Sequence, residues 1–131
     1  MIYFNTEQYA SMKANSDNLK LDAILQRIFP DNNKWGACPY FENGKLDFIE
    51  INKLSDVTQK GETWTHYATI GRYKSKDENN GEFWEVYSQF NGKLEDEMWI
   101  YGYYKYFKGA CHCAASESFL NKTRKPIKIY I

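Results

Sequence analysis

The stretch Gly81–Phe107 constrains the fold more than any other part of the sequence, because it alternates aromatic and aliphatic residues over two runs. It contains two of the four tryptophans and three of the eight phenylalanines, together with five tyrosines. Read with a period of two residues, the first run places Trp84 and Val86 on one face. The step Asn91-Gly92 lies between the two runs. Alternating runs around an Asn-Gly step predict a long antiparallel β-hairpin.

A helical pattern precedes the strands. One apolar stripe recurs at i, i+3, i+4, i+7 and i+8, formed by Leu21, Ile24, Leu25, Ile28 and Phe29. This spacing predicts a helix that packs one face against a sheet and ends before Pro30. The polar residues of the opposite side are expected to face solvent: Lys20, Asp22, Gln26 and Arg27.

A shorter helix is predicted in front of this one. Thr6 is its expected cap, and Tyr9 and Met12 are expected on its inner face. Ser16 or Asp17 is the expected cap of the second helix, because short polar side chains bond the free amides of a first turn.

From Trp35 onward the pattern is that of strands separated by turn signals. The predicted strands are Ala37–Phe41, Leu46–Ile51, Glu62–Tyr73, the two runs of the central hairpin and Ile127–Ile131. Asp56–Gly61 is predicted as a loop, and Ala114–Leu120 as a short helix or an irregular crossing.

The expected fold class is therefore α+β. Two N-terminal helices pack on a mostly antiparallel, meandering sheet of five or six strands. We expect a single domain over residues 1–131, helical in 1–30 and mainly β in 35–131, because no linker or change of composition divides the chain.

Charge and hydropathy argue against two classes of partner. Lys and Arg together number 17 and so do Asp and Glu, so no net field would concentrate nucleic acid, and we expect no nucleic-acid partner. No apolar run approaches the roughly 20 residues that span a bilayer, so we expect no membrane segment. Three cysteines do not make a disulfide framework, and no signal peptide precedes the first helix, so a cytoplasmic location is expected.

The cluster Cys111-His112-Cys113 is the candidate for a metal site. Together with Cys38 and His66 it would supply the nitrogen and sulfur donors that zinc binds tetrahedrally. The sequence has no CxxC pair, however, and strand alternation would place His112 opposite the two cysteines. We therefore predict no metal and no cofactor, with zinc binding as the alternative to buried thiols at the three cysteines.

A small-ligand-binding or catalytic pocket in a curved sheet is one functional hypothesis, with His66, Cys111 and His112 inside it. A nucleophilic cysteine needs a histidine base and a third group that orients the histidine. No glycine-rich turn of the kind that forms an oxyanion site precedes a cysteine, so the prediction leans away from an enzyme and names no catalytic residue.

The leading hypothesis is binding to a protein partner. The hairpin loop carries acidic residues, and the second run carries aromatic residues that alternation places together; these are Glu95, Asp96, Glu97, Trp99, Tyr101 and Tyr103. Tyrosine and tryptophan anchor protein interfaces, and an acidic loop steers a basic partner toward them. A lysine- and asparagine-rich composition is typical of AT-rich bacterial or phage genomes. We therefore expect an inhibitor of the toxin-immunity or phage anti-defence type, which occludes a toxin, a nuclease or a defence component.

Overall fold

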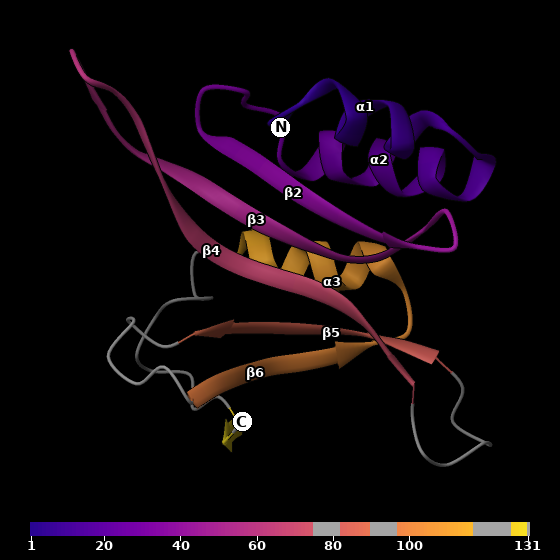
Figure 1. Ribbon diagram of the computed structural model, residues 1–131. Helices are drawn as coiled ribbons and strands as arrows, with labels where there is room; N and C mark the ends of the chain where they lie inside the picture. Colours follow the sequence, from indigo (N-terminus) through magenta and orange to yellow (C-terminus); the bar gives the residue numbers. More distant parts are fainter. Residues whose placement is uncertain (75–81, 90–96, 117–126, 131) are drawn as a thin grey trace. The chain divides into compact units, whose positions relative to one another are not determined.

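The helices and strands of the computed structural model lie within residues 1–74, 82–89, 97–116 and 127–130, which are the residues that the structure describes. The chain divides into two compact units, Met1–Tyr67 and Ala68–Ile131 (Figure 1). The elements are, in chain order, β1 (Ile2–Tyr3), α1 (Thr6–Lys13), α2 (Ser16–Ile28), β2 (Trp35–Glu42), β3 (Lys45–Thr58), β4 (Gly61–Lys74), β5 (Glu82–Gln89), β6 (Glu97–Tyr104), α3 (Phe107–Ala115) and β7 (Ile127–Tyr130). The boundary between the units falls inside β4.

The α+β prediction is confirmed. Neighbouring strands follow the order of the chain, β1-β2-β3-β4 in the N-terminal unit and β4-β5-β6-β7 in the C-terminal unit. Strand β1 runs parallel to β2, whereas the hairpin pairs β2–β3, β4–β5 and β5–β6, together with β6–β7, are antiparallel. The described strands exceed the expected number because β1 has two residues, too few to predict from their pattern.

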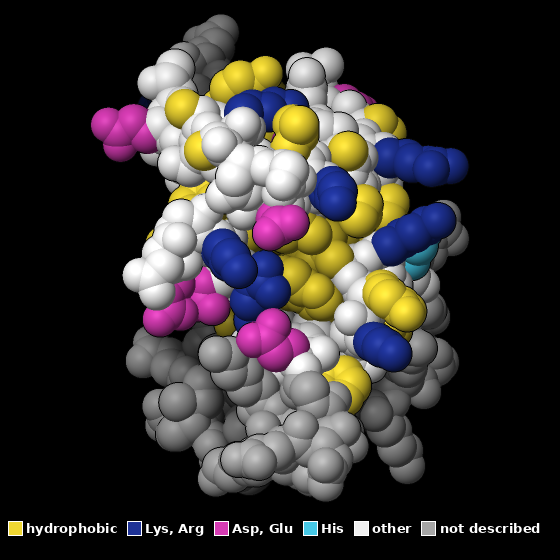
Figure 2. All heavy atoms as spheres, turned by 90° about the vertical axis from the view of Figure 1, so that its right-hand side faces the viewer, with side chains coloured by type: hydrophobic (Ala, Val, Ile, Leu, Met, Phe, Trp, Pro, Cys, Tyr) yellow, Lys and Arg dark blue, Asp and Glu magenta, His cyan; other side chains and the backbone are white. Residues whose placement is uncertain are grey.

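Charged side chains are mixed in sign on the surface that Figure 2 shows. Lysine and arginine side chains lie there between aspartate, glutamate and hydrophobic ones. This distribution agrees with the balance of 17 basic and 17 acidic residues in the whole sequence.

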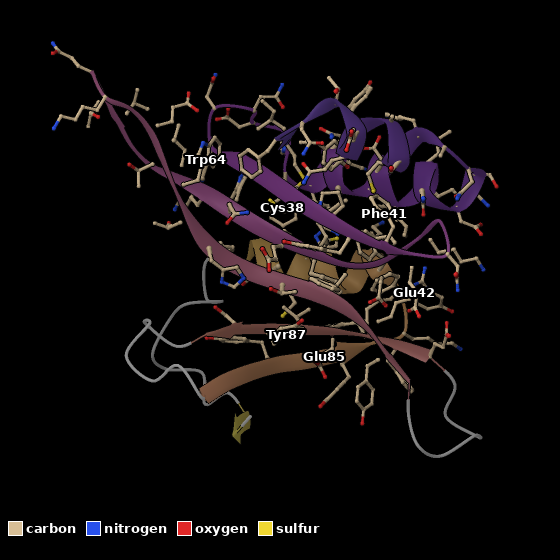
Figure 3. The ribbon with its side chains drawn as sticks, viewed as in Figure 1. Cys38, Phe41, Glu42, Trp64, Glu85 and Tyr87 are labelled. Carbon is tan, nitrogen blue, oxygen red and sulfur yellow. The ribbon has the colours of Figure 1, made fainter. Side chains whose placement is uncertain are left out.

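The hairpin of β2 and β3 has one apolar face and one mixed face. Ala37, Ile49 and Ile51 are fully buried, and the register pairs Ala37 with Ile51. The opposite face carries Cys38, which pairs with Glu50 and is labelled on β2 in Figure 3. The predicted alternation of this hairpin is confirmed.

The apolar stripe of α2 is confirmed as a core element. Leu25 and Phe29 are fully buried, and the remaining stripe residues are half-buried. In α1, Met12 is fully buried as predicted, but Tyr9 is 54% exposed. Its ring lies against Tyr3 and beneath the ammonium of Lys13, so it is held at the surface of the unit and not inside it.

Asparagines cap both N-terminal helices. Asn5 Oδ1 accepts a hydrogen bond from the backbone N–H of Gln8 at 2.8 Å, and Asn15 Oδ1 accepts one from that of Asn18 at 2.8 Å. Each asparagine precedes its helix by one residue and has extended backbone angles, which aim its side chain at the free amides of the first turn. The predicted caps are therefore wrong by one residue for α1 and by one or two for α2; they were Thr6, and Ser16 or Asp17.

The turn between β2 and β3 is fixed by a buried amide on α2. Asn43 and Gly44 have positive φ values of 52° and 78°, as the predicted Asn-Gly turn requires. Asn18 Nδ2 donates to the Gly44 carbonyl at 2.8 Å and to the Ser11 carbonyl at 3.1 Å. Its Oδ1 accepts from the Leu46 backbone N–H at 3.1 Å. One side chain thus joins α1, α2 and the hairpin.

The predicted loop Asp56–Gly61 is mostly strand. β3 continues to Thr58, and β4 begins at Gly61, which has a φ of 126°. Thr58 Oγ1 accepts a hydrogen bond from the Lys60 backbone N–H at 3.2 Å and closes a short turn. The polar side chains of this segment resemble loop composition, but backbone pairing and not side-chain burial sustains its strand.

In the C-terminal unit, α3 begins at Phe107, seven residues before the predicted helix or crossing. The Phe107 ring packs edge-on against Trp84 of β5, with centroids 4.7 Å apart. Tyr104 lies across two glycines: a Cβ on Gly102 would stand 2.9 Å from its ring, and one on Gly109 would stand 3.1 Å from it. These glycines make room for an aromatic ring between β6 and α3. The predicted C-terminal strand is confirmed as β7.

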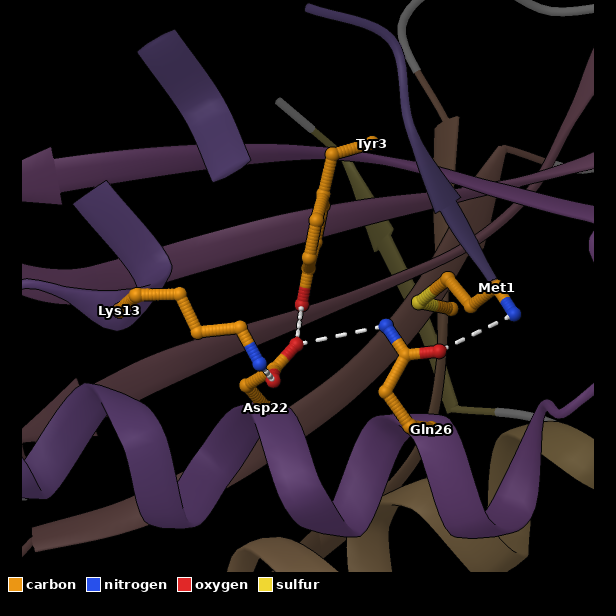
Figure 4. Close-up of polar contacts among 5 residues, drawn as sticks. All are labelled: Met1, Tyr3, Lys13, Asp22 and Gln26. Carbon is orange, nitrogen blue, oxygen red and sulfur yellow. Dashed lines mark hydrogen bonds and ion pairs between the residues drawn. The ribbon is translucent and has the colours of Figure 1, made fainter. Parts of the chain in front are cut away.

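A buried carboxylate organises the polar contacts of the N-terminal unit (Figure 4). Asp22 is 2% exposed, accepts a hydrogen bond from the Tyr3 hydroxyl at 2.6 Å and forms an ion pair with Lys13. Gln26 Nε2 donates to the same carboxylate at 3.3 Å, while its Oε1 accepts from the Met1 amino group at 3.3 Å. The expectation that Asp22 faces solvent is wrong, because three donors replace its water.

These contacts set the pKa of Asp22. Burial by itself would raise the pKa, but the hydrogen bonds from Lys13, Tyr3 and Gln26 favour the charged form and lower it overall. A lowered pKa in the folded state adds stability above the ordinary aspartate range, and that stability is lost as the pH falls through the folded-state pKa.

Asp22→Asn should lower the free energy of unfolding by about 1–3 kcal/mol at neutral pH, because the Lys13 ammonium loses its partner and the Tyr3 hydroxyl loses a charged acceptor. Urea unfolding followed by circular dichroism measures this difference. The difference should shrink at acidic pH, where the wild-type carboxyl is also neutral.

Asp17→Asn is the matched control, because Asp17 is exposed in the first turn of the same helix. Its effect should stay within about 0.5 kcal/mol. Equal effects of the two substitutions, or an Asp22 effect that does not change with pH, would contradict the role given to the buried carboxylate.

Candidate functional site

The structure places the sequence-predicted interface residues unequally. Glu95 and Asp96 lie outside the described residues. Glu97 and Trp99 belong to β6, where they pair with Tyr130 and Lys128 of β7, and their side chains are not described. The side chains of Tyr101 and Tyr103 are described: Tyr101 is half-buried and Tyr103 is exposed.

A β-bulge gives Tyr101 and Tyr103 different surroundings. The register of β5 and β6 shifts by one residue after Val86, so that the strict alternation expected for β6 is broken at Tyr101. The pKa of Tyr101 is raised by burial and by the charge of Cys113 on α3. The pKa of Tyr103 is raised by burial and by the nearby Glu85. The predicted single row of aromatic side chains is therefore interrupted.

Three residues form the candidate site, which we call the tyrosine face: Tyr73 of β4, Glu85 of β5 and Tyr103 of β6. The register places Glu85 directly opposite Tyr103, and on its other side opposite Gly71. The rings of Tyr73 and Tyr103 meet with centroids 5.1 Å apart and an interplanar angle of 55°. Tyr73 is 39% exposed and Tyr103 is 42% exposed, so both rings are accessible.

Glu85 is a residue of the candidate site that was not among the site residues predicted from the sequence. It lies between Phe83 and Tyr87 in the period-two pattern. An acidic residue within a row of aromatic residues is the sequence feature that could have identified it. Its side chain is half-buried, and burial raises its pKa. Among the described residues it has no hydrogen-bond donor and no ion-pair partner. A carboxylate that has lost water without gaining a partner is poised to accept one from outside.

The same unit places a cation beside an aromatic ring and a carboxylate on the other face of its strands. The guanidinium of Arg72 lies 4.5 Å from the centroid of the Trp84 ring, and its Nη1 is 3.7 Å from Glu82 Oε2. Arg72 and Trp84 are register partners in β4 and β5. Two neighbouring strands of this chain therefore bring a cation, an aromatic ring and a carboxylate into contact.

The residues of the alternative pocket hypothesis belong to different units. His66 lies in β4 within the N-terminal unit, whereas Cys111 and His112 lie in α3 of the C-terminal unit. Within the N-terminal unit, Glu50 influences both Cys38 and His66.

The charges around Cys38 and His66 do not favour a nucleophilic thiol. Burial and the charge of Glu50 raise the pKa of the Cys38 thiol, which keeps it protonated. Burial lowers the pKa of His66 even though much of the residue is exposed, and Glu50 opposes this shift. A nucleophilic cysteine needs a thiol whose pKa is lowered. In such a site the histidine contacts the thiol, and the acid contacts the histidine on its other side. Here the acid influences the thiol directly and disfavours the thiolate.

The cysteine cluster lies on helix α3. Cys111 and Cys113 are buried in α3, while His112 is exposed. Burial strongly raises the pKa of Cys111, which keeps this thiol protonated. The described part of the chain contains no group of three His, Cys, Asp or Glu side chains that could hold a metal ion.

Comparisons of the chain with models of known families, with curated proteins and with solved structures find no match. In the described part of the chain, no helix combines the length and the apolar character needed to cross a membrane. The functional interpretation therefore depends on the geometry of the chain itself.

Glu85→Gln should raise the free energy of unfolding at neutral pH by up to about 1 kcal/mol. The reason is that burial of an unpaired carboxyl group costs free energy mainly while the group is charged, and glutamine carries no charge. A raised pKa in the folded state gives stability that is full below the ordinary glutamate range and is lost as the pH rises through the folded-state pKa. The gain should therefore disappear at acidic pH, which urea titrations at two pH values can measure. A destabilised variant at neutral pH would contradict the absence of an internal partner.

Proposed function

We propose that this chain acts by binding another protein through the tyrosine face, and that it inhibits this partner by covering its working surface. The type of inhibitor that we propose is a toxin-immunity or phage anti-defence protein, with a toxin, a nuclease or a defence component as its target. Occlusion needs a complementary surface and no catalytic group, which suits a chain of this size.

The exposed contact between Tyr73 and Tyr103 is the observation that supports this proposal. Tyrosine offers a large, stiff contact area at low entropic cost and is enriched at the centres of protein interfaces. Glu85, the register partner of Tyr103, adds a polar group without an internal partner among the described residues. A ring pair beside a desolvated acid has the composition of an interface centre.

Affinity capture with tyrosine variants tests the proposal. Immobilised wild-type protein should retain one partner in stoichiometric amount from an extract of the cells that produce it. Tyr73→Thr with Tyr103→Thr should weaken retention by about 30-fold or more, the loss expected for an interface anchor. Threonine suits a strand position, so the fold should persist.

Tyr106→Thr is the matched control, since Tyr106 is 69% exposed and lies outside the tyrosine face. It should retain the partner as the wild type does. Equal retention by the double variant would overturn the proposed surface. A partner whose own activity is unchanged by saturating amounts of the protein would overturn inhibition by occlusion.

The acidic run Glu95-Asp96-Glu97 enters the proposal from the sequence alone. Glu95 and Asp96 precede β6 in the sequence and Glu97 is its first residue, and negative charge there would accelerate encounter with a basic partner. Charge reversal at Glu95 and Asp96 should slow association at low ionic strength and leave the circular dichroism spectrum unchanged. An unchanged association rate in low salt would contradict this steering role.

A further inference from the structure

We infer that the tyrosine face binds the guanidinium group of an arginine side chain presented by the protein partner, with Glu85 as its counter-ion and the rings of Tyr73 and Tyr103 as its walls. This inference deepens the proposed function and rests on it, because it names the partner chemistry that the same surface recognises.

The charge of the site selects a cation. The Glu85 carboxylate is half-buried, and no described side chain of the protein neutralises it. Its register partner Tyr103 contributes a ring whose electron-rich face attracts positive charge. An incoming anion or an apolar side chain would leave the carboxylate desolvated and unpaired, whereas a cation would bond it.

The shape of the site favours arginine among cations. The rings of Tyr73 and Tyr103 are in contact at an angle of 55°, and both are partly exposed, so they offer accessible aromatic surface to a planar group. A guanidinium group is planar, can stack on a ring and can present two N–H groups to a carboxylate at once. A lysine ammonium is compact and strongly hydrated, and it makes neither the stack nor the paired hydrogen bonds.

The chain itself uses this combination of groups. On the other face of the same strands, the Arg72 guanidinium lies over the Trp84 ring and pairs with Glu82. There the cation comes from β4, while the ring and the acid come from β5. On the tyrosine face, the rings and the acid are present, and the described residues supply no cation. The inferred arginine would occupy the corresponding place from outside.

A titration with N-acetyl-arginine amide tests the inference on the full chain. Nuclear magnetic resonance should detect shifts of the Tyr73 and Tyr103 ring signals that saturate at millimolar concentrations, the range expected for one weakly bound side chain. N-acetyl-citrulline amide has a similar shape but no charge and should cause no saturating shift. N-acetyl-lysine amide should bind several-fold more weakly than the arginine compound.

Glu85→Gln should weaken binding of the arginine compound by about tenfold, the loss expected when a charge-assisted hydrogen bond becomes neutral. Tyr103→Leu preserves the apolar area but removes the aromatic ring, and it should weaken binding as well. Glu82→Gln is the matched control: it makes the same change on the same strand, at the acid that pairs with Arg72, and should leave binding unchanged. Spectra of all variants report whether each is folded.

The outcomes separate this inference from the proposed function. Absence of saturating shifts with wild-type protein, equal binding of the citrulline compound, or equal binding of the lysine compound would overturn arginine recognition. If partner capture still depended on Tyr73 and Tyr103, the proposed function would stand without it. Conversely, saturable arginine binding without a captured protein that depends on the tyrosine face would preserve the site and overturn the protein-binding function.

Discussion

The buried carboxylate of Asp22 is the constraint on which the N-terminal unit depends. A charged group removed from water must be satisfied by its neighbours, and here the neighbours come from separate elements of the chain. The hydroxyl of Tyr3 positions β1, and the ammonium of Lys13 joins the end of α1 to α2. The ladder of β1 with β2 covers only two register pairs, so the Tyr3 bond adds to the hydrogen bonds by which the Met1 amino group holds the start of the chain.

A second buried polar group performs a related role in the first turn of α2, four residues before Asp22. The amide of Asn18 bonds to α1, to Gly44 in the β2–β3 turn and to Leu46 at the start of β3. Because its donor and acceptor atoms are both used, a shorter or apolar side chain would leave backbone groups unpaired. Asp22 and Asn18 thus set the place of the helices by hydrogen bonds, while Leu25 and Phe29 supply the apolar contact.

Those parts of the fold that produce a regular spacing of residues could be predicted from the sequence. The stripe of α2, the turn at Asn43-Gly44 and the alternating strands followed from spacing alone, and the structure confirms them. Periodicity could not reveal that a polar residue such as Asp22 faces inward, because this depends on donors from distant positions. It also could not reveal which of several short polar residues caps a helix.

The candidate site was predicted in composition but not in detail. An aromatic hairpin with acidic residues was expected, and Tyr103 lies on its accessible surface. A one-residue bulge leaves Tyr101 without a register partner in β5, and such a shift has no signature in an alternating pattern. The role proposed for Glu85 depends on the partners that it lacks among the described residues, which only the fold can show. The remaining predicted residues belong to segments whose side chains are not described.

The boundary between the two units has a consequence for any attempt to divide the gene. Most domain boundaries fall in exposed linkers, but this one falls within the uninterrupted strand β4. A fragment that ended at Tyr67 would cut β4 in two, and the part from Thr69 to Lys74 would stay paired with β5 in the other fragment. A strand that is cut within its length leaves backbone groups unpaired, and these are a template for aggregation. We therefore expect that neither half is exchanged between proteins as a separate domain, and that the two halves are inherited together.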